Sequence, residues 1–530
     1  MIMSVRKQES KMIGGQSHRD TLYGPLALAA LILCVVVSHL SLLRAPYFWD
    51  ETYFATAAHD VMISGKLVPA SVASESHPPL VYVWLAIWWK LLGFSIPVAR
   101  LSMLGIASLT LAGIYQVARM LTRGAVPIVT TVLTAVYPVF FVHSTMVQLD
   151  MAAAGLTLWG LAAHLRKRPW LAGVIFSLAV LAKETAIVAP MAVLAVEILR
   201  AIRSEKYKIG ASIQSVRSTG TPLLLAPLAL LWWFVLLHRA SGSIFGNSQQ
   251  YVGENVYSAL HPLRMALAFV QNIWHVVGYL NFFVLTGLAG IIIITRRRSQ
   301  GSRAFTEGNG TLLIVAVITA YLLIHSVFGA VVLARYLLPI YPLVVLACVA
   351  STASRVKWWP AVAVIVTGAF VAGLFPYTNW VLFRRDDNLA YLDYVSLHQS
   401  AADFLADRQK GKVMAVFPVT NELSSSWLGY VEHPLDIIDV DSYQQQDLIR
   451  AVRNQPRYIE MFPRRTCKAE NPLSQARWLP GNYFRGLPDP QPDEVVRWMN
   501  ARVIYYARRH CDWVAVLEVS GRATSASLEP

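Results

Sequence analysis

The chain has 530 residues, of which 55% are hydrophobic and only 15% are charged, with a formal net charge of +15. Soluble domains carry about 25% charged residues, so the composition excludes an ordinary soluble protein and predicts a polytopic α-helical membrane protein. Residues 1–378 hold 28 Lys and Arg against 12 Asp and Glu, whereas residues 379–530 hold 18 against 19. Because the basic excess lies in the membrane part, it indicates topology and not nucleic-acid binding.

Apolar runs recur along the first part of the chain, and a transmembrane helix needs about 20 such residues. We expect about eleven spans: 22–43, 98–118, 125–143, 148–165, 170–187, 188–200, 221–238, 272–295, 311–332, 336–353 and 358–377. With this number, the basic clusters between the spans all face the cytoplasm when the N-terminus is cytoplasmic. The short Trp- and Tyr-rich run 79–93 is predicted to be an interfacial helix, because one more span there would move every later basic cluster outside.

This topology places the loop 44–97, the loop 240–270 and the region 379–530 on the outer side of the membrane. A short helix is predicted at 51–64. The last region alternates helix-like and strand-like segments, which predicts a small α/β domain. The helix-like segments are 389–408, 443–453 and 492–508, and the strand-like ones are 412–419, 457–462 and 513–519. We therefore predict a transmembrane domain, 1–378, and an extracytoplasmic domain, 379–530.

Two cysteines, Cys467 and Cys511, lie in the external domain, where oxidation is permitted. A disulfide between them is a hypothesis, since no other cysteine lies there and the sequence does not show that they are close.

Acidic residues lie where two predicted spans meet the outer surface. Asp50 and Glu51 follow the first span. A carboxylate there can act as a general base toward an acceptor hydroxyl or amine, or bind a metal. The alternative is a solvated turn that ends the span. Asp150 opens the span 148–165, where it is either a functional acid or a helix N-cap.

Two cations are predicted at the same level. Lys183 interrupts an apolar stretch and is followed by Glu184, so it is either a snorkelling lysine paired with that glutamate or a ligand for a lipid-linked phosphate. Arg335 opens a run on the same predicted face. Two carboxylates and two cations thus converge on one membrane face, which favours a functional site.

Histidines add a weaker signal. His77 precedes Pro78 and Pro79, a rigid non-helical element that would hold it near the surface, although a lone histidine is more often structural. His261, in the second external loop, is the other histidine that we consider as a metal partner. His143 could lie nearby, but nothing in the sequence selects it.

Five short motifs carry a resemblance, and they occur in one order along residues 20–345. They are Asp50-Glu51, His77-Pro78-Pro79-Leu80, Gln148-Leu149-Asp150-Met151, Leu181-Ala182-Lys183 and Arg335-Tyr336-Leu337-Leu338-Pro339. In this order the chain resembles bacterial glycosyltransferases of the GT-C superfamily, in the branch that contains lipid A aminoarabinose transferases and protein O-mannosyltransferases.

The resemblance implies an enzyme of the bacterial inner membrane that takes a sugar from a polyprenyl-phosphate donor on the outer face. It maps the family's first acidic residue to Asp50, its second-loop acidic residue to Asp150 and its phosphate-binding lysine to Lys183. The basic or histidine position before the double proline maps to His77, near which some members bind a divalent metal.

Two departures from the family pattern leave open which donor is used. Thr52-Tyr53-Phe54 stands where aminoarabinose transferases often have an arginine, and Lys183-Glu184 replaces the family's common Lys-Gly.

The predicted site follows from both lines of reasoning. The predicted catalytic residues are Asp50, Asp150 and Glu51, and the predicted donor-phosphate ligands are Lys183, Arg335 and His77. A divalent metal is predicted at His77, His261 and Glu75. One base without a covalent intermediate predicts inversion at the anomeric carbon. The acceptor, whether lipid, glycan or protein, stays open.

An alternative function is a secondary transporter or flippase of an anionic lipid. Such a protein would place its charges near the bilayer midplane and show repeated halves. Here the charges lie at one predicted face and no repeat is visible, which favours the transferase.

Overall fold

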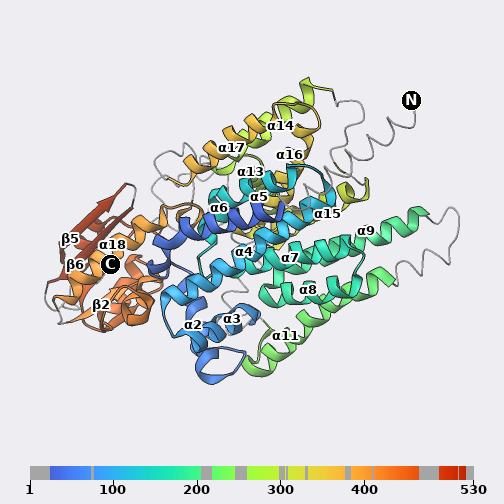
Figure 1. Ribbon diagram of the computed structural model, residues 1–530. Helices are drawn as coiled ribbons and strands as arrows, with labels where there is room; N and C mark the ends of the chain where they lie inside the picture. Colours follow the sequence, from blue (N-terminus) through green and yellow to red (C-terminus); the bar gives the residue numbers. More distant parts are fainter. Residues whose placement is uncertain are drawn as a thin grey trace, which may run out of the picture.

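The computed structural model describes residues 24–72, 77–204, 218–244, 260–297, 305, 308–328, 332–375, 384–408, 411–464, 489–510 and 512–520. A long helical bundle occupies most of the molecule, and a small domain with a β-sheet lies at one end of it (Figure 1).

The bundle is built of α-helices and short 3-10 helices, written η. After the helix Gly24–Ser38 they are η1 (Leu40–Arg44), α2 (Glu51–Ser64), α3 (Leu80–Leu92), α4 (Ile96–Leu121), α5 (Val126–Val136), α6 (Pro138–His143), α7 (Leu149–Leu165), α8 (Pro169–Ala182), η2 (Glu184–Ile187), α9 (Val188–Ser204), η3 (Thr221–Leu224), α11 (Leu225–Ser241), α13 (Pro262–Val277), η5 (Tyr279–Asn281), α14 (Phe282–Thr295), α15 (Gly308–Phe328), η6 (Ala334–Leu337), α16 (Tyr341–Ala353) and α17 (Trp359–Gly373).

Each predicted span overlaps one to three of these helices, and the span 272–295 covers parts of α13, η5 and α14. Five helical stretches of the described chain are long and apolar enough to cross a membrane: Ile96–Leu121, Glu184–Ile202, Ser218–Ser241, Pro262–Thr295 and Gly310–Val327. Seven other apolar helices have 10–17 residues. The chain is therefore mostly helical with many apolar helices, while the number that cross the membrane and their orientation remain predictions.

Two residues of the site, His143 and Lys183, lie at breaks between helices. Pro138 separates α5 from α6, so that α6 ends at His143. Lys183 has an extended backbone (φ −157°, ψ 131°) that ends α8 before η2 begins. Both side chains are buried inside the bundle.

Small residues allow close packing of α4, α7, α8 and α11, which contact one another in succession (Figure 1). Gly155 of α7 lies against α4 so closely that a Cβ there would be 2.3 Å from Oγ1 of Thr110. Small residues at helix contacts are a common way to bring membrane helices together. This close contact fixes the first turn of α7, which carries Asp150.

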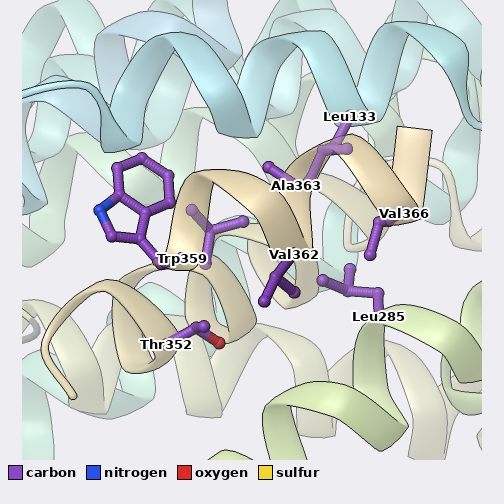
Figure 2. A pocket seen from close by; sticks show the side chains of 8 residues that line it. Leu133, Leu285, Thr352, Trp359, Val362, Ala363 and Val366 are labelled. Atoms are coloured by element: carbon purple, nitrogen blue, oxygen red, sulfur yellow. The ribbon is translucent and has the colours of Figure 1, made fainter. Parts of the chain in front are cut away.

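A small pocket lies elsewhere in the bundle, between α5, α14, α16 and α17 (Figure 2). Its lining is apolar except for the hydroxyl of Thr352 and the indole of Trp359. No charged side chain lines it, so it contains neither a carboxylate base nor a cation that could bind a phosphate.

The terminal domain begins after η8 (Arg385–Asp387). Its elements are α18 (Tyr391–Ala406), β2 (Lys412–Ala415), α19 (Val419–Ser424), η9 (Ser426–Leu428), β3 (Ile437–Asp439), α20 (Gln445–Val452), β4 (Pro456–Met461), α21 (Pro492–Met499), β5 (Ala501–Arg509) and β6 (Asp512–Val519). The sheet has the order β3-β2-β4-β6-β5, with β2 parallel to β3 and β4, and β6 antiparallel to β4 and β5. α18 contacts β5 and β6. A mixed sheet with helices agrees with the predicted α/β domain.

The helix predicted at 492–508 is wrong in its second half. α21 begins with a capping box between Gln491 and Glu494, and it ends at Asn500, which has a left-handed backbone (φ 46°). The following residues form the edge strand β5, because they pair with β6 over its whole length. The proposed disulfide lies outside the described residues, since neither Cys467 nor Cys511 is among them.

The terminal domain contacts the segment that leads into α2. The Tyr47 amide donates to the Leu428 carbonyl (3.2 Å), and the Tyr430 hydroxyl donates to the Tyr47 carbonyl (3.0 Å). The Asn421 amide reaches Oγ1 of Thr52 (3.2 Å). The domain therefore lies directly beside the start of α2, where Asp50 is found.

Candidate active site

A buried arginine, Arg335 of η6, joins three carboxylates. Its guanidinium forms an ion pair with Asp50, another with Asp386 (Nη1–Oδ2, 2.5 Å) and a longer contact with Asp150 (Nε–Oδ2, 3.6 Å). Only 5% of Arg335 is exposed. The planar guanidinium carries five N–H donors, so one arginine can hold several oxygens in a fixed arrangement.

The most accessible carboxylate of this group is Asp50, whose side chain is 31% exposed, against 5% for Asp150 and 12% for Asp386. Asp50 is the N-cap residue of α2, but its carboxylate makes no capping hydrogen bond. The carboxylate instead turns to Arg335. Asp50 is thus anchored by a cation and still open to a molecule that approaches from outside the cluster.

The neighbouring Glu51 has a different environment, because it is completely buried. It forms an ion pair with buried Arg100 (3.1 Å) and accepts hydrogen bonds from the backbone amides of Phe48 (2.8 Å) and Val147 (2.5 Å). Arg100 also donates to the Ala45 carbonyl (2.8 Å). These contacts fasten the segment before α2 to α4 and to the loop before α7, and they occupy both Glu51 oxygens.

Lys183 lies beside Asp150, with 2.6 Å between Nζ and Oδ1, and both residues are buried. Its Nζ also lies 4.1 Å from the centre of the Tyr336 ring, a cation–π arrangement. The next residue, Glu184, pairs instead with Nδ1 of His77 (2.8 Å). Lys183 therefore belongs to the Arg335 cluster, and the predicted pairing of Lys183 with Glu184 is not what the structure shows.

The residues predicted to bind a metal are His77, His261 and Glu75. His77 contacts Glu184 and the Phe54 ring, and it is absent from the contacts of Arg335 given above. His261 is exposed at the start of α13. Glu75 lies outside the described residues, so a site at His77, His261 and Glu75 stays a prediction.

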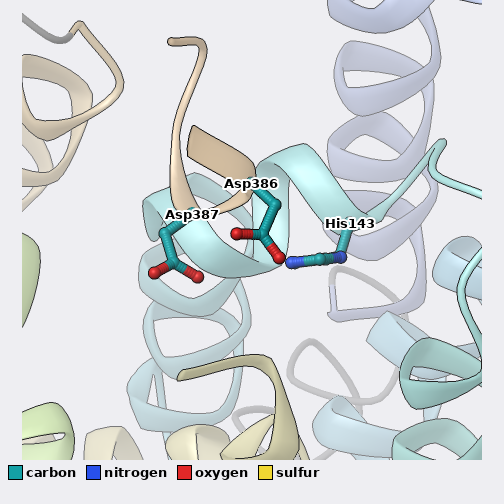
Figure 3. Close-up of side chains that lie close together, drawn as sticks. All are labelled: His143, Asp386 and Asp387. Atoms are coloured by element: carbon teal, nitrogen blue, oxygen red, sulfur yellow. The ribbon is translucent and has the colours of Figure 1, made fainter. Parts of the chain in front are cut away.

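A different group of metal-type side chains stands out in the described part of the chain. His143, Asp386 and Asp387 each place a ligand atom within 4.8 Å of those of the other two (Figure 3). Burial alone would raise the pKa of Asp386, but the charges of Arg335, His143 and Arg384 together with a backbone hydrogen bond outweigh it and lower that pKa. Burial, with the Asp386 charge beside it, raises the pKa of Asp387 to about 7. The Tyr279 hydroxyl donates to Asp387 (2.6 Å).

Sequence reasoning brought together Asp50, Asp150, Lys183 and Arg335, and the structure places these four side chains in one contact network. It missed Arg100, Asp386 and Asp387. The usable signal for the acidic pair was its position: Asp386 and Asp387 follow two arginines shortly after the last apolar run. Arg100 lies within a predicted span, where a charged residue is costly and therefore informative.

Chemically, the cluster suits a negatively charged ligand beside a base. Lys183 and Arg335 retain donors beyond those used by their carboxylate partners, and Arg335 Nε has no hydrogen-bond partner in the structure. Asp50 offers an accessible carboxylate oxygen close to these donors.

Comparison with known proteins gives a family match over part of the chain and a similar fold over most of it. Residues 76–233 match the family described as dolichyl-phosphate-mannose-protein mannosyltransferase. No curated protein sequence matches the chain. ArnT from Cupriavidus metallidurans, 14% identical, is similar over 92% of this chain and 97% of its own, with a TM-score of 0.53 for the apo structure and 0.50 for the structure bound to undecaprenyl phosphate.

A second solved structure is less similar to this chain. A crystal structure of the Archaeoglobus fulgidus oligosaccharyltransferase in complex with Zn and sulfate is 11% identical over 82% of this chain and 67% of its own, with a TM-score of 0.44, which is too low to carry an argument. The family match and the ArnT-like fold confirm the resemblance that the sequence motifs predicted.

Proposed function

We propose that this chain is a membrane glycosyltransferase of the GT-C type and transfers a sugar from a polyprenyl-phosphate donor to an acceptor on the outer face of the bacterial inner membrane. The family match and the ArnT-like fold support this proposal. One observation carries the proposal: Asp50 is an accessible carboxylate attached to a buried cluster that contains Lys183 and Arg335. A base next to two anion-binding cations matches the needs of this reaction.

The donor phosphate is assigned to Lys183 and Arg335. Both cations are already in place before the ligand arrives, because Asp150 contacts each of them. Preorganised donors stabilise charge that develops in the transition state without a reorganisation cost. The structure of ArnT bound to undecaprenyl phosphate shows that a protein of this fold can bind such a lipid. His77 pairs with Glu184, the residue that follows Lys183, and is assigned to the border of this subsite.

The acceptor is assigned to the open side of Asp50. The Asp50 carboxylate takes the proton of the acceptor hydroxyl or amine, and the acceptor atom forms a bond to the anomeric carbon. The bond between that carbon and the phosphate oxygen breaks, and its electron pair leaves with the polyprenyl phosphate. This leaving group is a stable anion, so the step requires no strong general acid. A single displacement inverts the anomeric configuration.

Glu51 is assigned to positioning and not to proton transfer. Its carboxylate is fully buried and already accepts hydrogen bonds from Arg100 and from two backbone amides. It therefore sets the backbone on which Asp50 stands. The terminal domain contacts the same segment through Asn421 and Thr52, so it borders the space beside Asp50 and can guide the acceptor.

The test is a transfer assay with the purified full chain in lipid nanodiscs, a set of undecaprenyl-phosphate sugars and membrane extracts as acceptors. We expect mass spectrometry to detect a new glycosidic product that is absent with Asp50→Asn. The matched control is Asp393→Asn, which removes an acid that pairs with His510 in the terminal domain. A transporter would instead move an unmodified lipid and form no new glycosidic bond.

A comparison of membrane lipids and surface glycans between a deletion strain and its parent identifies the acceptor. If the Asp50→Asn protein forms product at the unmutated rate, Asp50 is not the base.

A further inference from the structure

His143 is a buried histidine without hydrogen bonds. It ends α6, it is 0% exposed, and neither ring nitrogen has a hydrogen-bond partner in the structure. Burying a polar group without a partner is costly, so such a group in a native protein indicates an unseen ligand, ion or water. Figure 3 shows a ring nitrogen of His143 facing the Asp386 carboxylate.

The two carboxylates of this group lie far from His143 in the sequence. Asp386 and Asp387 lie on η8, which contacts α6 and leads into the terminal domain. The ligand atoms of the three residues lie within 4.8 Å of one another, but His143 is hydrogen-bonded to neither carboxylate. Ligand atoms on one tetrahedral ion, each about 2.0–2.2 Å from it, lie roughly 3.4 Å apart. Three ligand atoms that all lie within 4.8 Å of one another can therefore share one ion after small side-chain movements.

The local charge also favours a cation. Six formally charged groups meet around Arg335 and η8: the carboxylates Asp50, Asp150, Asp386 and Asp387, and the cations Lys183 and Arg335. Asp387, whose pKa is raised to about 7, is only partly ionised at neutral pH. Three negative charges and part of a fourth therefore face two buried positive ones, and Arg384 beside them is exposed and screened by solvent. An anionic phosphate would enter this region against an excess of negative charge.

We propose that His143, Asp386 and Asp387 bind one first-row divalent cation, Zn²⁺ or Mn²⁺. An imidazole suits Zn²⁺ and carboxylates suit Mn²⁺. The ion would be linked to the sugar-transfer site through Asp386, which also pairs with Arg335. It would balance the excess carboxylate charge and hold Arg335 in position for the donor phosphate. The role in transfer rests on the proposed function, whereas the binding of the ion does not.

The first test measures metal content. The full chain in nanodiscs is treated with a chelator, desalted, and titrated with Zn²⁺ and separately with Mn²⁺, with bound metal counted by elemental analysis. We expect one equivalent per chain in the unmutated protein and at least tenfold weaker binding in His143→Gln and in Asp387→Asn. His164→Gln is the matched control, since the His164 side chain is only 9% exposed but pairs with Glu197. It should bind the metal as the unmutated protein does.

A second variant separates loss of binding from loss of the fold. His143→Cys keeps a metal ligand at the same position, so we expect it to bind Cd²⁺ or Zn²⁺ while His143→Gln does not. Co²⁺ provides a spectroscopic readout: its visible absorption should change between the unmutated protein and His143→Cys, because a thiolate replaces the imidazole.

The outcomes are distinct. The site is supported if the unmutated protein binds one equivalent of ion, if His143→Gln and Asp387→Asn lose it, and if His143→Cys binds it again. No stoichiometric ion in the unmutated protein, or equal binding in His143→Gln and Asp387→Asn, means that a water bridges these groups, and the proposal is then wrong. Metal binding without any sugar transfer would reject the proposed function and leave the metal site standing. If the metal-free protein transfers sugar at the full rate, the proposed link through Asp386 between the ion and the transfer site is wrong, but the metal site itself is not rejected.

Discussion

Arg335 and Asp386, which are 51 residues apart in the chain, form a 2.5 Å ion pair that joins η6 of the bundle to the segment entering the terminal domain. Asp386 lies beyond residue 378, the predicted domain boundary. The candidate active site therefore draws on both predicted domains. This relationship makes Arg335 the residue through which the donor side, the base and the terminal domain are connected.

Replacement of Arg335 by lysine should reduce sugar transfer by about 10²-fold or more, because a single ammonium cannot reproduce a guanidinium that holds several oxygens at once. Because the substitution keeps the positive charge, the loss of rate reports the contribution of the guanidinium's geometry. The assay is the initial rate with the undecaprenyl-phosphate donor, and binding of undecaprenyl phosphate itself is measured in parallel. Arg239→Lys, at the end of α11, is the control. An Arg335→Lys protein with unchanged rate and binding would remove Arg335 from the donor site.

Lys183→Met should weaken both donor binding and turnover, because a phosphate contact exists in the ground state as well as in the transition state. It also leaves Asp150 buried without its closest partner, and breaking a buried pair costs about 3–5 kcal/mol. The double variant Lys183→Met with Asp150→Asn removes both charges, and it should regain thermal stability without regaining donor affinity. If the double variant also regained donor affinity, Lys183 would have a structural role only.

Arg100→Met should destabilise the protein by about 3–5 kcal/mol, because Glu51 then becomes a buried carboxylate without a cation. The measurement is the unfolding midpoint in nanodiscs together with the yield of monodisperse protein. Glu51→Gln with Arg100→Met should be more stable than Arg100→Met alone, since no unpaired charge remains. Equal stability of the single and double variants would show that Glu51 does not hold this segment through its charge.

The sequence predicted the convergence of Asp50, Asp150, Lys183 and Arg335 because the topology and the motif order place each of them near one membrane face. It did not predict Asp386 or His143 as members of the same region, because their proximity depends on how η8 returns to α6 after the last helix. No local pattern encodes such a return.

The terminal domain shows a similar limit. Amphipathic spacing predicted α18 and α20, and apolar runs predicted β2, β4 and β6. The segment 501–508 contains several arginines and tyrosines, and it is part of the predicted helix 492–508. It forms an edge strand because β6 offers it a partner and Asn500 ends the preceding helix. Tertiary pairing here overrides local preference.

His398 gives the terminal domain a specific dependence on pH. Burial lowers its pKa, but Glu422 and Glu460, each 3.3 Å from Nδ1, outweigh burial and raise the pKa to about 9. An unfolded histidine titrates near 6.5. The raised pKa therefore contributes stability that is fully present below pH 6.5 and is lost as the pH rises through about 9. The difference corresponds to roughly 3 kcal/mol.

We therefore expect the terminal domain to be more stable at pH 7 than at pH 9.5, and His398→Gln to lack this difference. The measurement is hydrogen exchange of the α18 and β4 amides in the full chain, corrected for the intrinsic rate at each pH. His510→Gln is the control, because His510 pairs with Asp393 at the exposed surface of the same domain. Protection that stays constant from pH 7 to 9.5 in the unmutated protein would show that His398 carries no proton there, and that the two glutamates do not share its charge.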